Sequence, residues 1–141
     1  MVIDPDQDFD PTEELYLRLS LERRPTQSAI KKAIAEQVHF PKCSVNRGKY
    51  SEPYDVVRLK PGWSVGVFEV RDIPASLECK VQGLYEFFVF HCPEADTDGV
   101  MNYAHSEIRS RFDGNLRQPG RLVKFEFREL IAFRMKVLPP L

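Results

Sequence analysis

Two segments rich in Val, Phe, Tyr and Trp most constrain what this chain of 141 residues can fold into. They are GWSVGVFEVRDI at residues 62–73 and GLYEFFVFHC at residues 83–92. β-Branched and aromatic residues are enriched in strands, and both segments have the length of a strand. We therefore expect these two segments to form the centre of a β-sheet.

Further elements are predicted on the N-terminal side of these strands. Apolar residues recur at every second position from Leu15 to Leu21, which favours a strand, although Thr12 could instead cap a helix. The apolar residues of PTQSAIKKAIAEQV, residues 25–38, recur at helical spacing and predict an amphipathic helix. Residues 40–62 are rich in Pro, Gly, Ser and Asn, so we expect a long connection with a short helical turn at residues 52–57.

The C-terminal segment RLVKFEFRELIAFRMKVL, residues 121–138, is ambiguous. Val123, Phe125 and Phe127 alternate as in a strand, whereas Phe127, Leu130 and Ile131 have helical spacing. We expect a strand leading into a final helix, after a turn at residues 113–120. Together these elements predict a single α+β domain over residues 15–141, with a mostly antiparallel sheet of about four to six strands and two or three helices.

Composition is that of an ordinary globular protein, with 43% hydrophobic and 29% charged residues. No segment approaches the roughly 20 apolar residues of a membrane span, and the acidic N-terminus is unlike a secretory signal, so we expect a cytoplasmic protein without membrane contact. The cysteines Cys43, Cys79 and Cys92 are odd in number and lack CxxC spacing. We expect them to be reduced thiols, mostly buried.

Charge is distributed unevenly along the chain. Six of the 21 acidic residues fall within residues 4–14, a stretch without Lys or Arg, which leaves 20 basic residues against 15 acidic ones elsewhere. Residues 1–14 are therefore expected to form an acidic, flexible lead-in. The basic excess in the remainder is a weak argument for an anionic ligand.

The segment NYAHSEIRSRF, residues 102–112, contains the candidate catalytic residues. In a strand, Tyr103, His105, Glu107 and Arg109 share one face. His105 could then act as a general base, Glu107 could fix its tautomer, and Arg109 could bind an anionic group. The competing interpretation is an exposed, charged strand face without chemistry.

The sequence lacks the residues that define several other kinds of site. The His-x-Glu of HSE resembles that of zinc deaminases, but all cysteines lie upstream, and in a strand the neighbours His91 and Cys92 point to opposite faces. We therefore expect neither a metal nor a cofactor. SVNRGKYS, residues 44–51, lacks the nucleotide-binding Gly-x-x-x-x-Gly-Lys pattern, although it could hold an anion. The contiguous aromatics of YEFFVF indicate core packing, so nucleic acid is not an expected partner.

The order of LYLRL, CSVNRGKYSEPYDVV and NYAHSEI over residues 15–108 resembles a family of small uncharacterised bacterial proteins. That family is marked by a Ser-Val-x-Arg segment and an Asn-x-Ala-His segment. The resemblance implies a bacterial cytoplasmic protein in which Ser44, Arg47, Asn102 and His105 belong to one site.

Two classes of function follow. The first is an accessory module that binds another protein, since no catalytic signature is complete. The second is a small enzyme or ligand-binding protein acting on an anionic substrate, with His105 as general base and Arg47 or Arg109 as anion ligand. A polar cleft joining residues 44–51 to the His105 strand favours the second function, and a flat apolar patch favours the first.

Overall fold

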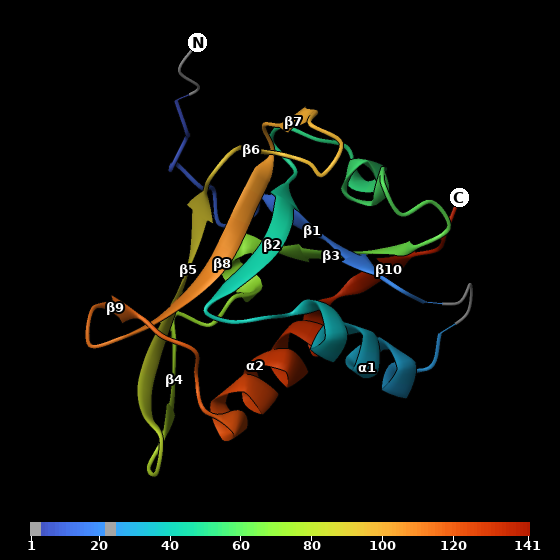
Figure 1. Cartoon of the computed structure of the whole chain (residues 1–141). Coiled ribbons are helices and arrows are strands. Elements are labelled where there is room, and N and C mark those ends of the chain that lie inside the picture. Colours follow the sequence, from blue (N-terminus) through green and yellow to red (C-terminus); the bar gives the residue numbers. More distant parts are fainter. Residues whose placement is uncertain (1–3, 22–24) are drawn as a thin grey trace.

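The computed structural model describes residues 4–21 and 25–141, and an antiparallel sheet of eight strands dominates this part of the chain (Figure 1). The strands run in the order β10-β3-β1-β2-β8-β5-β4, and β9 pairs with β8. Their bounds are β1 Glu14–Leu19, β2 Lys42–Arg47, β3 Ser64–Glu69, β4 Ser76–Cys79, β5 Gly83–His91, β8 His105–Phe112, β9 Asn115–Leu116 and β10 Lys136–Leu138. Two further short strands, β6 Glu94–Ala95 and β7 Met101–Asn102, pair only with each other.

Two helices, α1 Gln27–Gln37 and α2 Arg121–Arg134, lie together beneath the curved sheet (Figure 1). α1 begins after Thr26, whose hydroxyl accepts a hydrogen bond from the Ala29 amide at 3.1 Å. The short 3₁₀ helices η1 Pro53–Val57 and η2 Val70–Asp72 connect strands. We call the sheet face toward α1 and α2 the inner face and the opposite one the outer face.

The main core lies between the inner face and the two helices. Phe127 of α2 is fully buried, and its ring packs against Phe40 and Phe87 with centroid distances of 4.9 and 4.7 Å. Leucines of β1 and Val45 and Ile108 of the central strands belong to the same buried cluster. A smaller cluster on the outer face places Val57 of η1 against β1 and β3. η1 therefore covers part of the outer face and leaves the β2–β8 part accessible beside it.

The predicted fold class is confirmed, as are the elements at residues 14–19, 27–37, 64–69 and 83–91. The prediction of a long connection at residues 40–62 was wrong in part, because it contains β2 at the centre of the sheet. The prediction for residues 121–138 was also wrong, because the helix comes first and a strand follows. The sheet has eight strands where about four to six were expected.

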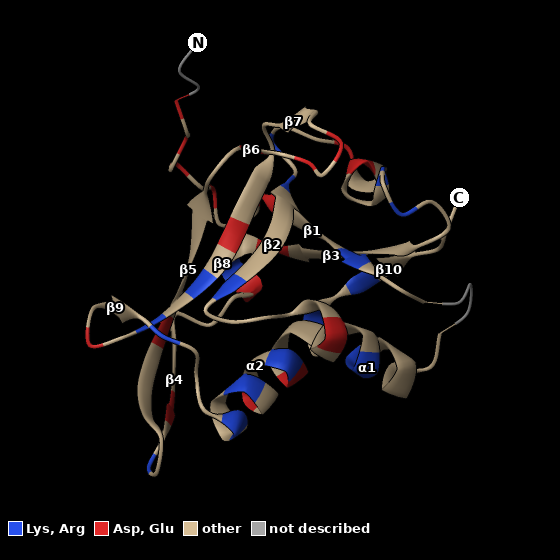
Figure 2. Cartoon of the chain, viewed as in Figure 1, with Lys and Arg blue, Asp and Glu red and all other residues tan. Residues whose placement is uncertain are grey.

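The described part of the N-terminal lead-in makes specific contacts with the domain; residues 1–3 lie outside the described residues. The His91 Nδ1 accepts a hydrogen bond from the Asp6 amide, and the Gln7 side chain bonds both backbone groups of His91. Figure 2 shows this acidic segment crossing the end of β5. Among the described helices, none is long and apolar enough to cross a membrane.

Candidate functional site

Central strands β2 and β8 place the candidate residues on the outer face of the sheet. They pair in antiparallel register, with Ser44 opposite Glu107 and Asn46 opposite His105. Because side chains alternate along a strand, Val45 and Ile108 point into the main core while these four residues point away from it. The alternation predicted for His105, Glu107 and Arg109 is confirmed, although Tyr103 precedes the strand and lies in a turn.

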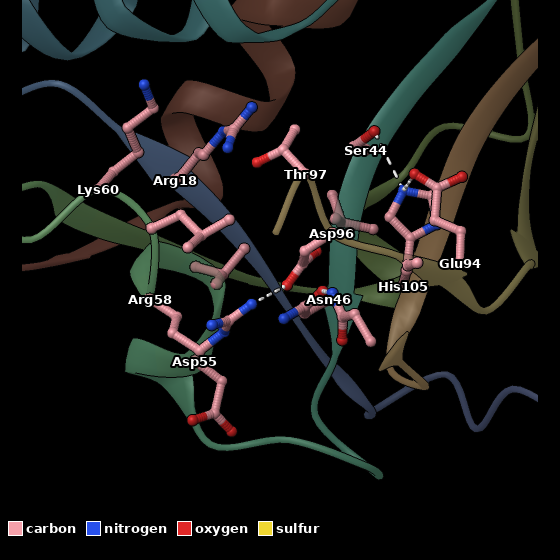
Figure 3. Close-up of a pocket in the computed structure, with 15 residues that line it drawn as sticks. Arg18, Ser44, Asn46, Asp55, Arg58, Lys60, Glu94, Asp96, Thr97 and His105 are labelled. Carbon is pink, nitrogen blue, oxygen red and sulfur yellow. Dashed lines mark hydrogen bonds and ion pairs between the residues drawn. The ribbon is translucent and has the colours of Figure 1, made fainter. Parts of the chain in front are cut away.

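A pocket of about 380 Å³ lies over this part of the outer face (Figure 3). Strands β1 and β2, the η1 region, the segment around β6 and the start of β8 all contribute to it. Its lining residues are Arg18, Ser44, Val45, Asn46, Asp55, Val56, Arg58, Leu59, Lys60, Glu94, Ala95, Asp96, Thr97, Asn102 and His105. This volume falls in the range of sites that bind small molecules.

His105 is the most enclosed titratable group of the pocket, with 6% of its surface exposed. Its Nδ1 lies 2.9 Å from the Cys92 carbonyl oxygen, which can only accept a hydrogen bond. We infer from this contact that Nδ1 carries the hydrogen, so in the neutral ring Nε2 has a lone pair. Nε2 lies 3.2 Å from Glu94 Oε1 and 3.3 Å from Ser44 Oγ, toward the pocket (Figure 3).

Glu94, rather than the predicted Glu107, is the carboxylate in ion-pair range of His105. Glu107 Oε1 instead accepts a hydrogen bond from Arg109 Nε at 2.9 Å and forms an ion pair with Arg109 Nη2 at 2.8 Å. The Arg109 guanidinium also stacks on the Phe90 ring at 4.0 Å. Glu107 and Arg109 therefore form a pair beside the pocket, and neither belongs to its lining among the described residues.

Arg47 does not lie in the pocket with the other predicted residues. Its side chain is fully buried, and it bonds both carboxylate oxygens of Glu13 at 2.8 Å. It also donates to the backbone carbonyls of Asp6 and Asp8 and lies 3.9 Å from the centre of the Phe9 ring. Burial alone would lower the pKa of Arg47, but the hydrogen bonds and charge of Glu13 raise it above its ordinary value. Arg47 thus anchors the N-terminal segment.

Ser44, Asn102 and His105 are the predicted residues that the fold brings together at the pocket. Asn102 donates from Nδ2 to the Asn46 Oδ1 at 2.8 Å, which links the loop before β8 to β2. Asn46 belongs to residues 44–51, the segment that could hold an anion, but it was not assigned to one site with Ser44 and His105; its position two residues after Ser44 is the signal that places it there.

An ion-pair cluster of Arg58 with Asp96 and Asp98 borders the pocket and was not predicted. The Arg58 guanidinium contacts Asp96 at 2.8 Å and Asp98 at 2.8 Å. The hydrogen bonds that Arg58 donates to Asp98 and then to Asp96 raise the pKa of Arg58, and they lower the pKa of Asp98 to about 2. This cluster fastens the β6–β7 segment to the end of η1. No sequence pattern indicated it, because its members lie about 40 residues apart.

The cysteines near the site do not have the properties of nucleophiles. Burial, then the charge of Glu107, raises the pKa of Cys92 to about 11, and burial raises that of Cys43 to about 12. Both thiols therefore stay protonated near neutral pH. All three cysteines are free, as expected.

His91 does not join His105 in a shared site. It is fully buried, and its Nε2 lies 2.6 Å from the Tyr103 carbonyl oxygen while its Nδ1 accepts from the Asp6 amide. Both ring nitrogens are thus occupied by the backbone. His91 therefore holds the N-terminal segment against the end of β5.

Comparison with models of known protein families, with curated proteins and with solved structures finds no match. The resemblance to the family with Ser-Val-x-Arg and Asn-x-Ala-His segments therefore stays a prediction.

Proposed function

We propose that this protein binds a small anionic molecule in the pocket beside His105. The observation that carries the proposal is the polar pocket itself, which joins Ser44 of β2 to Asn102 and His105. A polar cleft between these segments is the feature that distinguishes a ligand-binding protein from a module with a flat apolar surface.

The charges of the pocket support a ligand with an anionic end. Arg18 and Lys60 lie on the side away from His105, whereas Glu94 lies beside it (Figure 3). Arg58 lies on the same side as Arg18 and Lys60 but is already paired with Asp96 and Asp98 (Figure 3). We therefore place the anionic group of the ligand against Arg18 and Lys60, and its polar or protic group against Ser44 and His105.

The stronger form of this proposal is catalytic. The Nε2 of His105 faces the pocket, while the Cys92 carbonyl oxygen holds Nδ1. Such an imidazole is oriented to take a proton from a bound molecule, as a general base does. Glu94, at 3.2 Å, would stabilise the imidazolium that forms.

The test is a titration of ¹⁵N-labelled protein with inorganic phosphate, followed by two-dimensional NMR. We expect shifts of the amides of Ser44, Asn46 and Asn102. Lys60→Ala should weaken binding about three- to tenfold, because one charge facing the anion is lost. Lys80→Ala is the matched control, since Lys80 is an exposed lysine in the turn after β4.

Equal weakening of phosphate binding by Lys60→Ala and Lys80→Ala would show that the binding depends only on the net charge of the protein. Shifts that are absent from these three amides, or that spread over the whole surface, would contradict the pocket as the binding site.

A protein-interaction module is the second candidate function, and the outer surface of α2 favours it. Four large apolar side chains of this helix are exposed to between 41% and 79%: Leu122, Phe125, Leu130 and Phe133. A group of exposed apolar residues on one helix is a feature of protein-binding surfaces. Replacing Phe125 and Phe133 by serine would remove this surface without changing the pocket, which separates the two functions in a binding assay.

A further inference from the structure

We propose that Glu94, His105 and Glu107 bind a divalent first-row transition-metal ion at the end of the pocket where His105 lies. The ligand atoms of these three side chains all lie within 4.8 Å of one another. The inference rests on the proposed pocket, and it assigns the Nε2 of His105 to a cation instead of a proton.

The spacing of two of the three donor atoms suits a metal ion. His105 Nε2 and Glu94 Oε1 are 3.2 Å apart. Two ligands of a tetrahedral zinc site, each about 2.0–2.1 Å from the ion, are separated by about 3.3–3.4 Å. These two atoms are therefore already close to the separation that a shared ion requires.

The contact between His105 and Glu94 itself calls for a positive charge. With the hydrogen of the neutral ring on Nδ1, the lone pair of Nε2 faces a carboxylate oxygen of Glu94. Both atoms are then acceptors, and two acceptors at this distance repel each other unless a proton or a metal ion lies between them. Ser44 Oγ, at 3.3 Å, can donate to Nε2 but does not neutralise the Glu94 charge.

Two of the three ligands are held in place by neighbouring groups, as is usual for metal ligands. The Cys92 carbonyl oxygen orients the His105 ring through Nδ1. Arg109 holds one oxygen of Glu107 with a hydrogen bond from Nε and an ion-pair contact from Nη2. Glu94, which is exposed on β6, already lies 3.2 Å from His105 Nε2, so Glu107 is the ligand whose carboxylate must move closer to share the ion.

The donor set distinguishes among divalent ions. One imidazole with two carboxylates suits Zn²⁺, Mn²⁺ or Fe²⁺, whereas Mg²⁺ prefers oxygen ligands alone. Because Glu94 and His105 also line the pocket, the open side of the ion would face the bound molecule. A cation there would contact the protic or anionic group of the ligand at the end opposite Lys60.

The experiment is calorimetric titration of chelator-treated protein with Zn²⁺, with Co²⁺ absorbance to report a protein-bound, low-coordinate ion. We expect one Zn²⁺ per chain in the wild type, and weaker binding by about tenfold or more in Glu94→Gln. Glu86→Gln is the matched control, because Glu86 is exposed on the same sheet and pairs with Arg111 as Glu107 does with Arg109. Glu86→Gln should bind Zn²⁺ as the wild type does.

Wild type that binds no Zn²⁺ up to millimolar concentration would overturn the inference, and so would equal weakening in Glu86→Gln and Glu94→Gln. The phosphate titration, repeated with EDTA present, tests the pocket alone. Phosphate binding without Zn²⁺ binding would refute the metal site and leave the proposed function standing. Zn²⁺ binding without phosphate binding, in the loaded protein as well, would refute the proposed anionic ligand and leave the metal site standing.

Discussion

Arg47 and His105 are polar residues on neighbouring strands, but their side chains have different surroundings. Both are more than nine-tenths buried, but Arg47 is surrounded by partners from the N-terminal segment, whereas His105 Nε2 faces a pocket. A buried charge is tolerated only when it is paired and hydrogen-bonded, and Glu13 meets that condition for Arg47. The environment of Arg47 is therefore that of a structural residue.

Arg47→Ala should lower the free energy of unfolding by about 3–5 kcal/mol, because it leaves the largely buried Glu13 carboxylate without its partner. Urea denaturation followed by fluorescence measures this loss. Lys49→Ala is the control: Lys49 also pairs with Asp6 but is half exposed, so its loss should lower the free energy of unfolding far less than the loss of Arg47 does. Similar midpoints for the two variants would show that Arg47 is not the anchor.

At the scale of elements, the predictions succeeded where a strand or helix has one apolar face. They failed where contacts within the folded chain determine the secondary structure. β2 was missed because its sequence, KCSVNR, has only two apolar residues and lies among turn-forming residues. Its place at the centre of the sheet comes from pairing with β1 and β8. Without β2, the alternation that separates Asn46 from Arg47 could not be applied, and Arg47 was grouped in one site with Ser44 and His105.

The sequence at the start of α2 indicated a strand, whereas the structure has a helix there. Val123, Phe125 and Phe127 alternate, yet Val123 and Phe127 share the buried face of a helix while Phe125 is 63% exposed. The contacts of Phe127 with Phe40 and Phe87 select the helical spacing. Glu94 and Arg58 were beyond prediction for a related reason, since each meets its partner only through the folded chain.

The Arg58 cluster should depend on pH in a defined direction. Asp98 has a pKa of about 2 in the folded chain, below its ordinary value of 3.8. Its contribution to stability is therefore fully present above the ordinary value and is lost as the pH falls through about 2. NMR titration of the Asp98 side-chain carboxyl should follow this midpoint, and in Arg58→Gln the midpoint should move toward 3.8.

An unchanged midpoint in Arg58→Gln would mean that Arg58 does not stabilise the Asp98 carboxylate.

For the whole molecule, the N-terminal segment joins parts of the sheet that are distant in sequence. Asp6 and Gln7 contact His91 at the end of β5, and Tyr103 donates to the Asp4 carbonyl oxygen. Hydrogen bonds from Lys49 and Tyr50 hold the pKa of Asp6 well below its usual range. Asp6 and Glu13 of this segment therefore have basic and hydroxyl partners on the domain.

Deletion of residues 1–9 distinguishes an attached segment from the flexible lead-in that composition predicts. A flexible lead-in could be removed without effect, whereas loss of the backbone partners of Arg47 and His91 leaves buried polar groups unsatisfied. We expect the free energy of unfolding to fall by about 2–4 kcal/mol in urea denaturation. Tyr103→Phe, which removes only the bond to Asp4, should cost less than about 1 kcal/mol. A deletion variant as stable as the full chain would show that Arg47 and His91 satisfy their hydrogen bonds with water, and that the segment contributes nothing to the fold.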